Sequence, residues 1–269
     1  MQVAGVFFNL TLPLNPAAPS LFIYKLSDMS LILHKAHSRG HANHGWLNSH
    51  HSFSFASYHN PERVHFGVLR VLNDDWIAGG EGFGKHPHDN MEIITIPLTG
   101  ALEHQDSMGN KEVLHAGEVQ AMSAGTGIHH SEYNAKADEP CTLLQIWIFP
   151  EKRNVTPQYA QKYYDVEAVQ REWHAVVNPV GKGEGLEIHQ QAWFSLSRIP
   201  AGTKRDYDVK RAENGVYFFV IEGAIKLDDQ PLEARDAAGV MGSSRYAIEA
   251  NEDAFVLAMD IPLQLPQMG

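Results

Sequence analysis

The chain has 269 residues, of which 43% are hydrophobic and 20% charged, a composition that is typical of a globular protein and excludes a largely disordered one. Its formal net charge of -11 argues against direct binding to nucleic acid, because a phosphate-backbone binder needs a basic face. No apolar run approaches the ~20 residues that span a bilayer, and the single cysteine, Cys141, cannot form an internal disulfide, so a reducing, cytoplasmic compartment is expected.

The first 28 residues differ in character from the rest of the chain. The segment "MQVAGVFFNLTLPLNPAAPSLFIYKLSD" is apolar and contains proline, yet its first basic residue is Lys25. A secretory signal begins with positive charge before its apolar core, and this segment does not. We interpret residues 1–28 as a poorly ordered extension, arising from an upstream start codon, and expect the patterned protein to begin at Met29.

From about residue 52 to residue 150, short apolar-rich segments follow one another at close spacing. "SFSFASY", "HFGVLRVLN", "MEIITIPLTG", "ALEHQDS", "EVQAMSAG" and "CTLLQIWIFP" are separated by Gly, Asn and Asp residues. Such spacing, with almost no helical periodicity, predicts a β-barrel or sandwich. Residues 154–173 interrupt the pattern, and Thr156-Pro157 resembles a helix start. We expect a short helical linker there.

The second half of the chain repeats the pattern of the first. "EIITIPLTGALEHQDS" aligns with "GVYFFVIEGAIKLDDQ", which places Gly100 against Gly223, and a further alignment places Leu114 against Leu232. One repeat at this distance indicates two similar domains rather than a solenoid. The prediction is an N-terminal domain over residues 29–150 and a C-terminal domain over residues 151–269.

Two histidine motifs in the first half predict a metal site. In "GFGKHPHDNME", His86 and His88 are two residues apart, and in "GTGIHHSEYN", His130 and Glu132 have the same spacing. Side chains at i and i+2 of a strand point to the same side, so two facing strands can gather three imidazoles and one carboxylate. Nitrogen and oxygen ligands suit Fe, Mn, Co, Ni, Cu or Zn, and the absence of thiolates argues against a closed structural zinc site. Four protein ligands leave room for a substrate.

Three further residues lie close in sequence to the four candidate ligands, and each has a different expected role. His129 should point to the face opposite His130. Glu92 is either a fifth ligand or, as we prefer, an acceptor for the N–H of a ligand imidazole. His104 either lines the pocket or faces water, and the sequence does not decide between these two positions.

The motifs also resemble a known family. The spacing from Gly80 through His86, His88 and Glu92 to Gly100 is similar to the first cupin motif, and residues 117–134 resemble the second. More narrowly, "HGWLNSHHSFSFASY", "FGKHPHDNMEI", "EHQDSMGN", "MSAGTGIHHSEYN" and "QIWIFP" resemble pirins, above all bacterial pirin-like quercetinases. The resemblance covers nearly everything from Met29 onward. Ser123 stands where cupins usually have proline, and the turn before the histidine is two residues longer, both of which are usual in pirins.

The resemblance implies an all-β bicupin, with two jelly-roll β-barrels and metal in the N-terminal one. Carried over by position, the pirin ligands fall on His86, His88, His130 and Glu132. In the alignment of the repeat, Ile248 and Ala250 of the second domain correspond to His130 and Glu132. The positions that correspond to His86 and His88 fall near Val209 and Arg211. No metal can be held by such residues, so the second domain is expected to be a structural partner.

The resemblance further implies a quercetin 2,3-dioxygenase, an enzyme that opens a flavonol ring with O2 and releases carbon monoxide. Fe(II) is then the first candidate metal, with Cu, Zn, Mn, Ni and Co as alternatives, and Glu132 is the candidate catalytic base. The alternative is an iron-binding redox sensor that regulates transcription through protein partners, as eukaryotic pirins do. A metal-bound cupin with another substrate stays open as a third hypothesis.

The His-rich opening "HKAHSRGHANHGW" allows a second metal site from His37, His41 and His44. The tract is part of the pirin resemblance, with Trp46 and residues 53–55 expected to pack beside the barrel. We therefore favour a structural or pocket-rim role.

Overall fold

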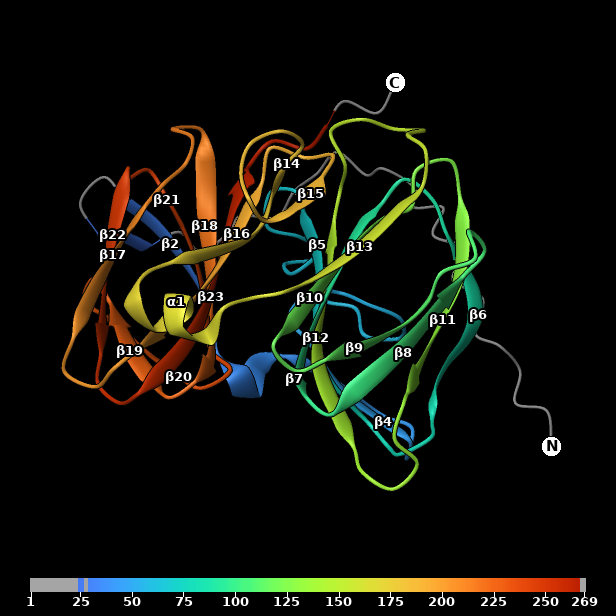
Figure 1. Ribbon diagram of the computed structural model, residues 1–269. Helices are drawn as coiled ribbons and strands as arrows, with labels where there is room; N and C mark the ends of the chain where they lie inside the picture. The colour runs from blue at the N-terminus through green and yellow to red at the C-terminus, as the bar shows by residue number, and fades with distance from the viewer. Residues whose placement is uncertain (1–23, 27–28, 267–269) are drawn as a thin grey trace.

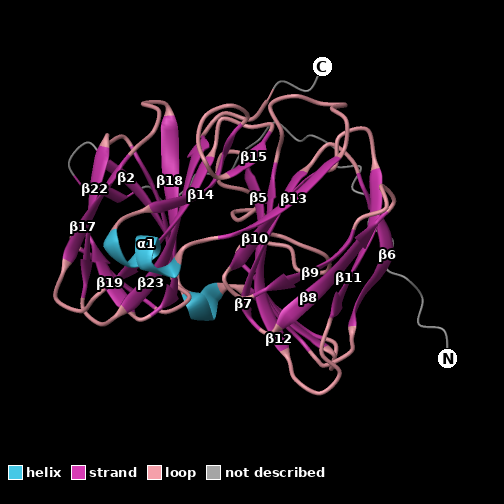
Figure 2. Ribbon diagram, in the orientation of Figure 1, coloured by secondary structure: helices cyan, strands magenta, loops and turns pink. Residues whose placement is uncertain are grey.

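The computed structural model describes residues 24–26 and 29–266, and their regular secondary structure is almost entirely β-strand (Figures 1 and 2). Strand pairing gives four sheets, which form two units of one large and one four-stranded sheet each. The predicted all-β, two-unit jelly-roll architecture is confirmed. Hydrogen bonding does not join the two sheets of a unit along their edges, so each unit is an open, sandwich-like jelly roll rather than a closed barrel.

The first unit contains a seven-stranded and a four-stranded sheet. In spatial order, the seven strands are β13 (Gln158–Tyr163), β10 (Glu118–Ser123), β7 (Glu92–Thr99), β12 (Cys141–Ile148), β5 (Leu69–Ile77), β4 (Leu47–His51) and β3 (Gly40–Asn43). The four are β6 (Gly82–His88), β11 (Ile128–Asn134), β8 (Ala101–Asp106) and β9 (Lys111–His115).

The second unit repeats this plan with an eight-stranded and a four-stranded sheet. The eight strands are β1 (Tyr24–Leu26), β2 (Met29–His34), β21 (Ala237–Met241), β18 (Asn214–Glu222), β23 (Ala254–Pro262), β16 (Trp193–Ile199), β14 (His174–Pro179) and β15 (Leu186–Ile188). The four are β17 (Lys204–Asp208), β22 (Arg245–Ala250), β19 (Ala224–Leu227) and β20 (Gln230–Glu233). The helical elements are η1 (Ala36–Ser38) and α1 (Val166–Arg171).

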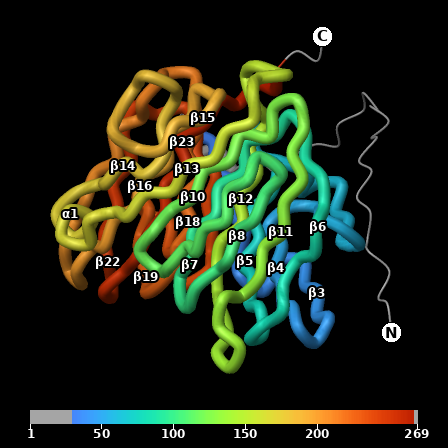
Figure 3. The backbone as a smooth tube through the Cα atoms, turned by 45° about the vertical axis from the view of Figure 1, so that its right-hand side comes forward, coloured from blue at the N-terminus to red at the C-terminus, as the bar shows by residue number. Residues whose placement is uncertain are grey.

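Two strands lie in the unit that their place in the sequence does not suggest. Strand β2, near the start of the chain, pairs with β21 in the second unit (Figure 1). Strand β13, which follows residue 150, pairs with β10 in the first unit (Figures 1 and 3). A boundary at residue 150 therefore assigns every strand to its correct unit except β1, β2 and β13. Most of the predicted extension, residues 1–23 and 27–28, lies outside the described residues, while Tyr24–Leu26 forms β1 against β2.

The helix start expected at Thr156-Pro157 is wrong. Residues 158–163 form an edge strand instead, in which Tyr159 and Gln161 are half-buried and their neighbours are exposed, so the period is two. A proline just before an edge strand removes no ladder hydrogen bond, which is why Pro157 is compatible with this strand. The linker helix begins only at Val166, where the Asp165 side chain accepts a hydrogen bond from the Glu167 N–H.

The hairpins that the repeat aligned have the same backbone geometry in the two units. Gly100 connects β7 to β8 with φ +74°, and Gly223 connects β18 to β19 with φ +76°. A Cβ at either position would lie 2.9 Å or less from a backbone oxygen, of Pro140 or of Asp253. Only glycine combines this conformation with this closeness, so the shared glycine is a structural requirement of the repeated hairpin.

The apolar core is distributed unevenly between the units. The largest cluster lies between the two large sheets and includes residues of both units, among them Ile94, Ile146, Phe219 and Met259. A second cluster fills the interior of the second unit. The interior of the first unit has only two small apolar clusters, and its other inward positions are polar. Among the described residues, no helix is long and apolar enough to cross a membrane.

Candidate metal centre

Strands β6 and β11 bring the two predicted histidine motifs together. They pair antiparallel, with His86 opposite His130 and His88 opposite Ile128. The glycine-rich sequence of β6 permits this approach, because a Cβ at Gly82 would lie 2.2 Å from the backbone oxygen of Glu132. Strand β6 is also the edge of its sheet, so the site forms at the border of the first unit.

Three imidazoles converge at this border. The ring centroids of His86, His88 and His130 are 4.4–4.9 Å apart. One ligand nitrogen from each lies within 4.8 Å of the others, whereas two nitrogens bound to one metal at about 2.1 Å are at most about 4.2 Å apart, so a bound cation would draw the three rings slightly closer together. His130 is 1% exposed, whereas His86 and His88 are only partly buried, so the cluster faces solvent on the β6 side.

The nitrogen atoms of these rings are arranged as metal ligation requires. His86 Nδ1 lies 2.8 Å from the Gly84 carbonyl oxygen, to which it donates, and this leaves Nε2 with a free lone pair. His130 Nε2 is buried and has no hydrogen-bond partner. An unpaired buried nitrogen is unfavourable by about 1–3 kcal/mol, and a cation bound among the three rings would satisfy it. The residues therefore fit a divalent transition metal.

Burial keeps two of these imidazoles neutral. It lowers the pKa of His88 to about 3 and that of His130 to about 2, and neighbouring imidazoles act in the same direction. Neutral imidazole is the form that binds metal. Trp147 stands edge-on to His88, with ring centroids 4.8 Å apart, and forms the wall behind it.

Glu132, the fourth predicted residue, faces the interior of the first unit. The strand register shifts between His130 and Glu132, and the carboxylate is 2% exposed. Gln145 Nε2 donates to both of its oxygens, at 3.0 and 3.3 Å, while Thr95 Oγ1 donates to Gln145 Oε1 at 2.9 Å. Sequence reasoning missed Gln145 and Thr95, because only the pairing of β12 with β7 places these two residues side by side near Glu132.

Glu132 belongs to a second group of candidate ligand atoms. It lies with His104 and His130, all within 4.8 Å of one another, so the two groups share His130. His104 is fully buried and points inward, which settles the choice that the sequence left open. Its strand β8 pairs with β11, and the register places His104 directly opposite Glu132.

Both expectations for Glu92 are wrong. Its carboxylate accepts a hydrogen bond from Ser123 Oγ at 2.6 Å and another from the His189 backbone N–H. Its strand neighbour Ile93 packs with the small interior cluster near Trp147, and alternation turns Glu92 to the opposite face, toward the second unit. Glu92 is therefore a buried group at the contact between the units, and burial raises its pKa to about 7.

The remaining histidine predictions have mixed outcomes. His129 is exposed, as expected. His41 stacks on His50 with ring centroids 4.6 Å apart, and its Nε2 forms a hydrogen bond with Asn48. Within the described part of the chain, both candidate metal groups contain His130. A second metal site from His37, His41 and His44 therefore gains no support.

The aromatic residues of the His-rich opening pack as expected. Trp46 contacts Phe83, while Phe55 contacts Trp147, the wall behind His88.

The matching positions of the second unit hold no such cluster. Ile248 and Ala250 are buried in its apolar interior, as the repeat predicted. The prediction that the counterparts of His86 and His88 lie near Val209 and Arg211 is wrong, because β17 ends at Asp208 and its register places Arg205 opposite Ile248.

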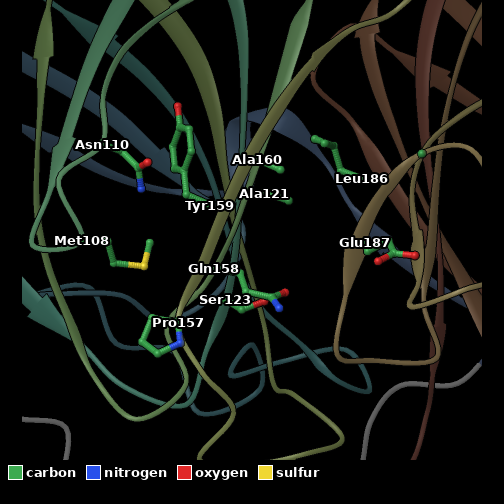
Figure 4. Close-up of a pocket in the computed structure, with 11 residues that line it drawn as sticks. Met108, Asn110, Ala121, Ser123, Pro157, Gln158, Tyr159, Ala160, Leu186 and Glu187 are labelled. Carbon is green, nitrogen blue, oxygen red and sulfur yellow. The ribbon is translucent and has the colours of Figure 1, made fainter.

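A cleft of about 560 Å³ opens beside the edge strand β13 (Figure 4). Its lining residues are Met108, Asn110, Ala121, Ser123, Pro157, Gln158, Tyr159, Ala160, Gly185, Leu186 and Glu187. The ring of Tyr159 stacks on His104 with centroids 4.5 Å apart, so this residue lies between the cleft and the buried histidines.

Comparison with known proteins identifies the family. The pirin family model matches residues 33–148, and the model described as quercetinase C-terminal cupin domain matches residues 175–261. A protein of Escherichia coli strain K12 named quercetin 2,3-dioxygenase is 44% identical over 232 residues, covering 86% of this chain and 99% of that protein. The chain belongs to the pirin family.

Other pirins extend the comparison. A pirin-like protein of Caulobacter vibrioides is 38% identical over 222 residues, which is 82% of this chain and 95% of the relative. The crystal structure of the Escherichia coli bacterial pirin YhhW in complex with nickel(II) has a TM-score of 0.82 at 42% identity, covering 86% of this chain and 99% of that one. The pirin fold predicted from the sequence is thus confirmed.

Proposed function

We propose that this pirin is a metal-dependent dioxygenase that acts as a quercetin 2,3-dioxygenase, opening the flavonol ring with O2. The observation that carries the proposal is the convergence of the His86, His88 and His130 imidazoles, in which the buried Nε2 of His130 has no hydrogen-bond partner. The Escherichia coli relative with that name, 44% identical along almost its whole length, supports the choice of reaction.

The proposed ligands are His86, His88, His130 and Glu132, holding one divalent transition metal. The nickel(II) complex of the Escherichia coli pirin supports a divalent ion in this family. Fe(II) stays our first candidate for this chain, with Ni, Cu, Zn, Mn and Co as alternatives, because nitrogen and oxygen ligands discriminate poorly among these metals.

The reaction inserts both atoms of O2 into the flavonol and yields a depside and carbon monoxide. When bound, the cation would supply a Lewis acid that lowers the pKa of a coordinated hydroxyl. Glu132 then accepts the proton of the flavonol 3-hydroxyl, since its carboxylate is held by a single amide donor, Gln145, and keeps lone pairs free. The partly exposed His86 and His88 leave the approach from the β6 side open to a substrate.

The test compares flavonol turnover in His88→Ala and Glu132→Ala with that in His129→Ala. His129 is exposed and adjoins His130, so its variant is a matched control for loss of an imidazole on the same strand. We expect the first two variants to fold and to lose turnover, and the control to retain it. Undiminished activity in metal-depleted His88→Ala would refute the proposal.

The same assay separates the enzyme from the iron-binding redox sensor that acts through protein partners. Metal-loaded protein is mixed with quercetin in air, and its visible absorbance band is followed together with release of carbon monoxide. Steady bleaching with carbon monoxide supports the dioxygenase. A bound flavonol whose band stays stable would contradict it and would favour the sensor.

A further inference from the structure

A chain of hydrogen-bonding groups runs from a surface loop to His130. Asp106 Oδ2 lies 3.3 Å from His104 Nε2, and His104 Nδ1 lies 3.5 Å from His130 Nδ1. We infer that Asp106 and His104 are positioning residues that hold a proton on His130 Nδ1 and thereby keep His130 Nε2 free to bind the metal. The inference rests on the metal site proposed above and adds to it the groups that prepare the ligand.

The loop after β8 fixes Asp106 as an acceptor. Its Oδ1 accepts the backbone N–H of Met108 at 2.8 Å and that of Asn110 at 3.1 Å, and its Oδ2 accepts the Asn110 side-chain amide at 2.7 Å. Every one of these partners is a donor, as the ionised, acceptor-only carboxylate requires. The nitrogen of His104 that faces Asp106 must therefore carry a proton.

This proton determines the rest of the chain. A neutral imidazole has one donor and one acceptor nitrogen, so His104 Nδ1 is left as an acceptor. His130 Nδ1 faces it and must donate, which leaves the lone pair of His130 on Nε2, the atom that is buried without a partner. Tyr159 stacks on the His104 ring at an interplanar angle of 26° and restrains its orientation.

An alternative role for His104 is that of a direct metal ligand, because His104, His130 and Glu132 form the second candidate group. The hydrogen-bond geometry favours the positioning role. His104 Nε2 faces Asp106 and His104 Nδ1 faces His130, so both nitrogens already have partners. A carboxylate behind a histidine that orients a metal ligand is a recurrent arrangement around metal sites.

The decisive variant is Asp106→Asn. Its oxygen can keep the backbone N–H groups of Met108 and Asn110, while its amide nitrogen donates toward His104 Nε2. His104 then carries its proton on Nδ1, and the proton of His130 is driven to Nε2, where it blocks the metal. We expect the dissociation constant for Ni(II), used as the probe, to rise by about 10- to 100-fold.

Two further variants complete the titration of full-length protein with Ni(II). Asn110→Ala removes one hydrogen bond to Asp106 without reversing any proton, and its affinity should stay near the wild-type value. His86→Ala removes a proposed ligand and should abolish binding. If His86→Ala binds as tightly as wild type, the proposed metal site fails. If His86→Ala loses the metal while Asp106→Asn binds normally, the positioning inference alone is overturned.

A measurement on the unmodified protein covers the case in which Asp106→Asn does not fold. Nitrogen-15 NMR of histidine-labelled, metal-free wild type reports which ring nitrogen carries the proton, and a His130→Gln spectrum identifies the resonance. We expect His130 in the Nδ1–H form. An Nε2–H form in wild type, or binding in His104→Leu lost as completely as in His86→Ala, would contradict the inference.

Discussion

The two units share one strand plan, yet only the first concentrates polar groups in its interior. Strand β11 turns His130 and Glu132 inward, where β22 turns Ile248 and Ala250. The second interior is one continuous apolar cluster, while the first is split into two small ones around buried polar residues. The difference shows that the fold supplies positions, and that the chemistry depends on where apolar packing is given up.

The edge strands differ in the same way. Strand β6 is glycine-rich and carries partly exposed histidines, which leaves the site open. In β17, Arg205 donates to backbone oxygens of α1, and Tyr207 packs edge-to-face against Trp173 and Phe218. The second unit thus uses the matching strand to close its interior and to anchor the linker.

The largest effect is expected when the inward residues are exchanged between the units. Ile248→His with Ala250→Glu places a charge in an apolar interior without a partner, so the free energy of unfolding should fall by on the order of 3–5 kcal/mol. No second metal should bind, because Arg205 and Tyr207 stand where β6 has imidazoles. Urea denaturation and metal analysis measure both effects.

The reciprocal exchange, His130→Ile with Glu132→Ala, serves as its control. It removes polar groups rather than burying them, so it should cost far less stability while metal is lost. Equal destabilisation by the two exchanges would show that the interiors do not differ as described.

A smaller effect is expected at the contact between the units. Glu92 has an ordinary pKa of 4.5 that burial raises to about 7, so the native state holds a proton that the unfolded chain releases. The stability that this proton provides is complete below pH 4.5 and is lost as the pH rises through 7, a loss of about 3 kcal/mol. Relative to wild type, Glu92→Gln should therefore gain stability between pH 5 and pH 8, measured by urea denaturation. Parallel pH profiles for the two proteins would contradict the burial of an ionisable Glu92.

The smallest effect is expected from Gln145→Met. This variant removes the donor to Glu132 at nearly constant volume, and we expect flavonol turnover to fall about tenfold as Glu132, the proposed base, loses its orientation. Thr95→Val is the matched control, since it removes the next hydrogen bond and leaves the Gln145–Glu132 bond in place. Equal losses in the two variants would assign the effect to core packing instead.

The sequence was sufficient for the features that depend on local pattern. Strand alternation placed His86, His88 and His130 together, and the repeat located Gly223, Ile248 and Ala250. Prediction from the sequence failed where a residue's position depends on pairing between segments that are distant in the chain. The helix start at Thr156-Pro157 was wrong because β13 finds a partner in β10, and Glu92 was misplaced because its environment comes from Ser123 and the second unit. Gln145 and His104 act through strands that only the fold brings to the site.

The most direct measurement is the metal content of protein purified without added metal, determined for wild type, His88→Ala and Glu132→Ala. We predict one transition-metal ion per wild-type chain and close to none in the two variants, with thermal unfolding of all three still cooperative. One ion retained in both folded variants would contradict a metal centre formed by these side chains in the first unit.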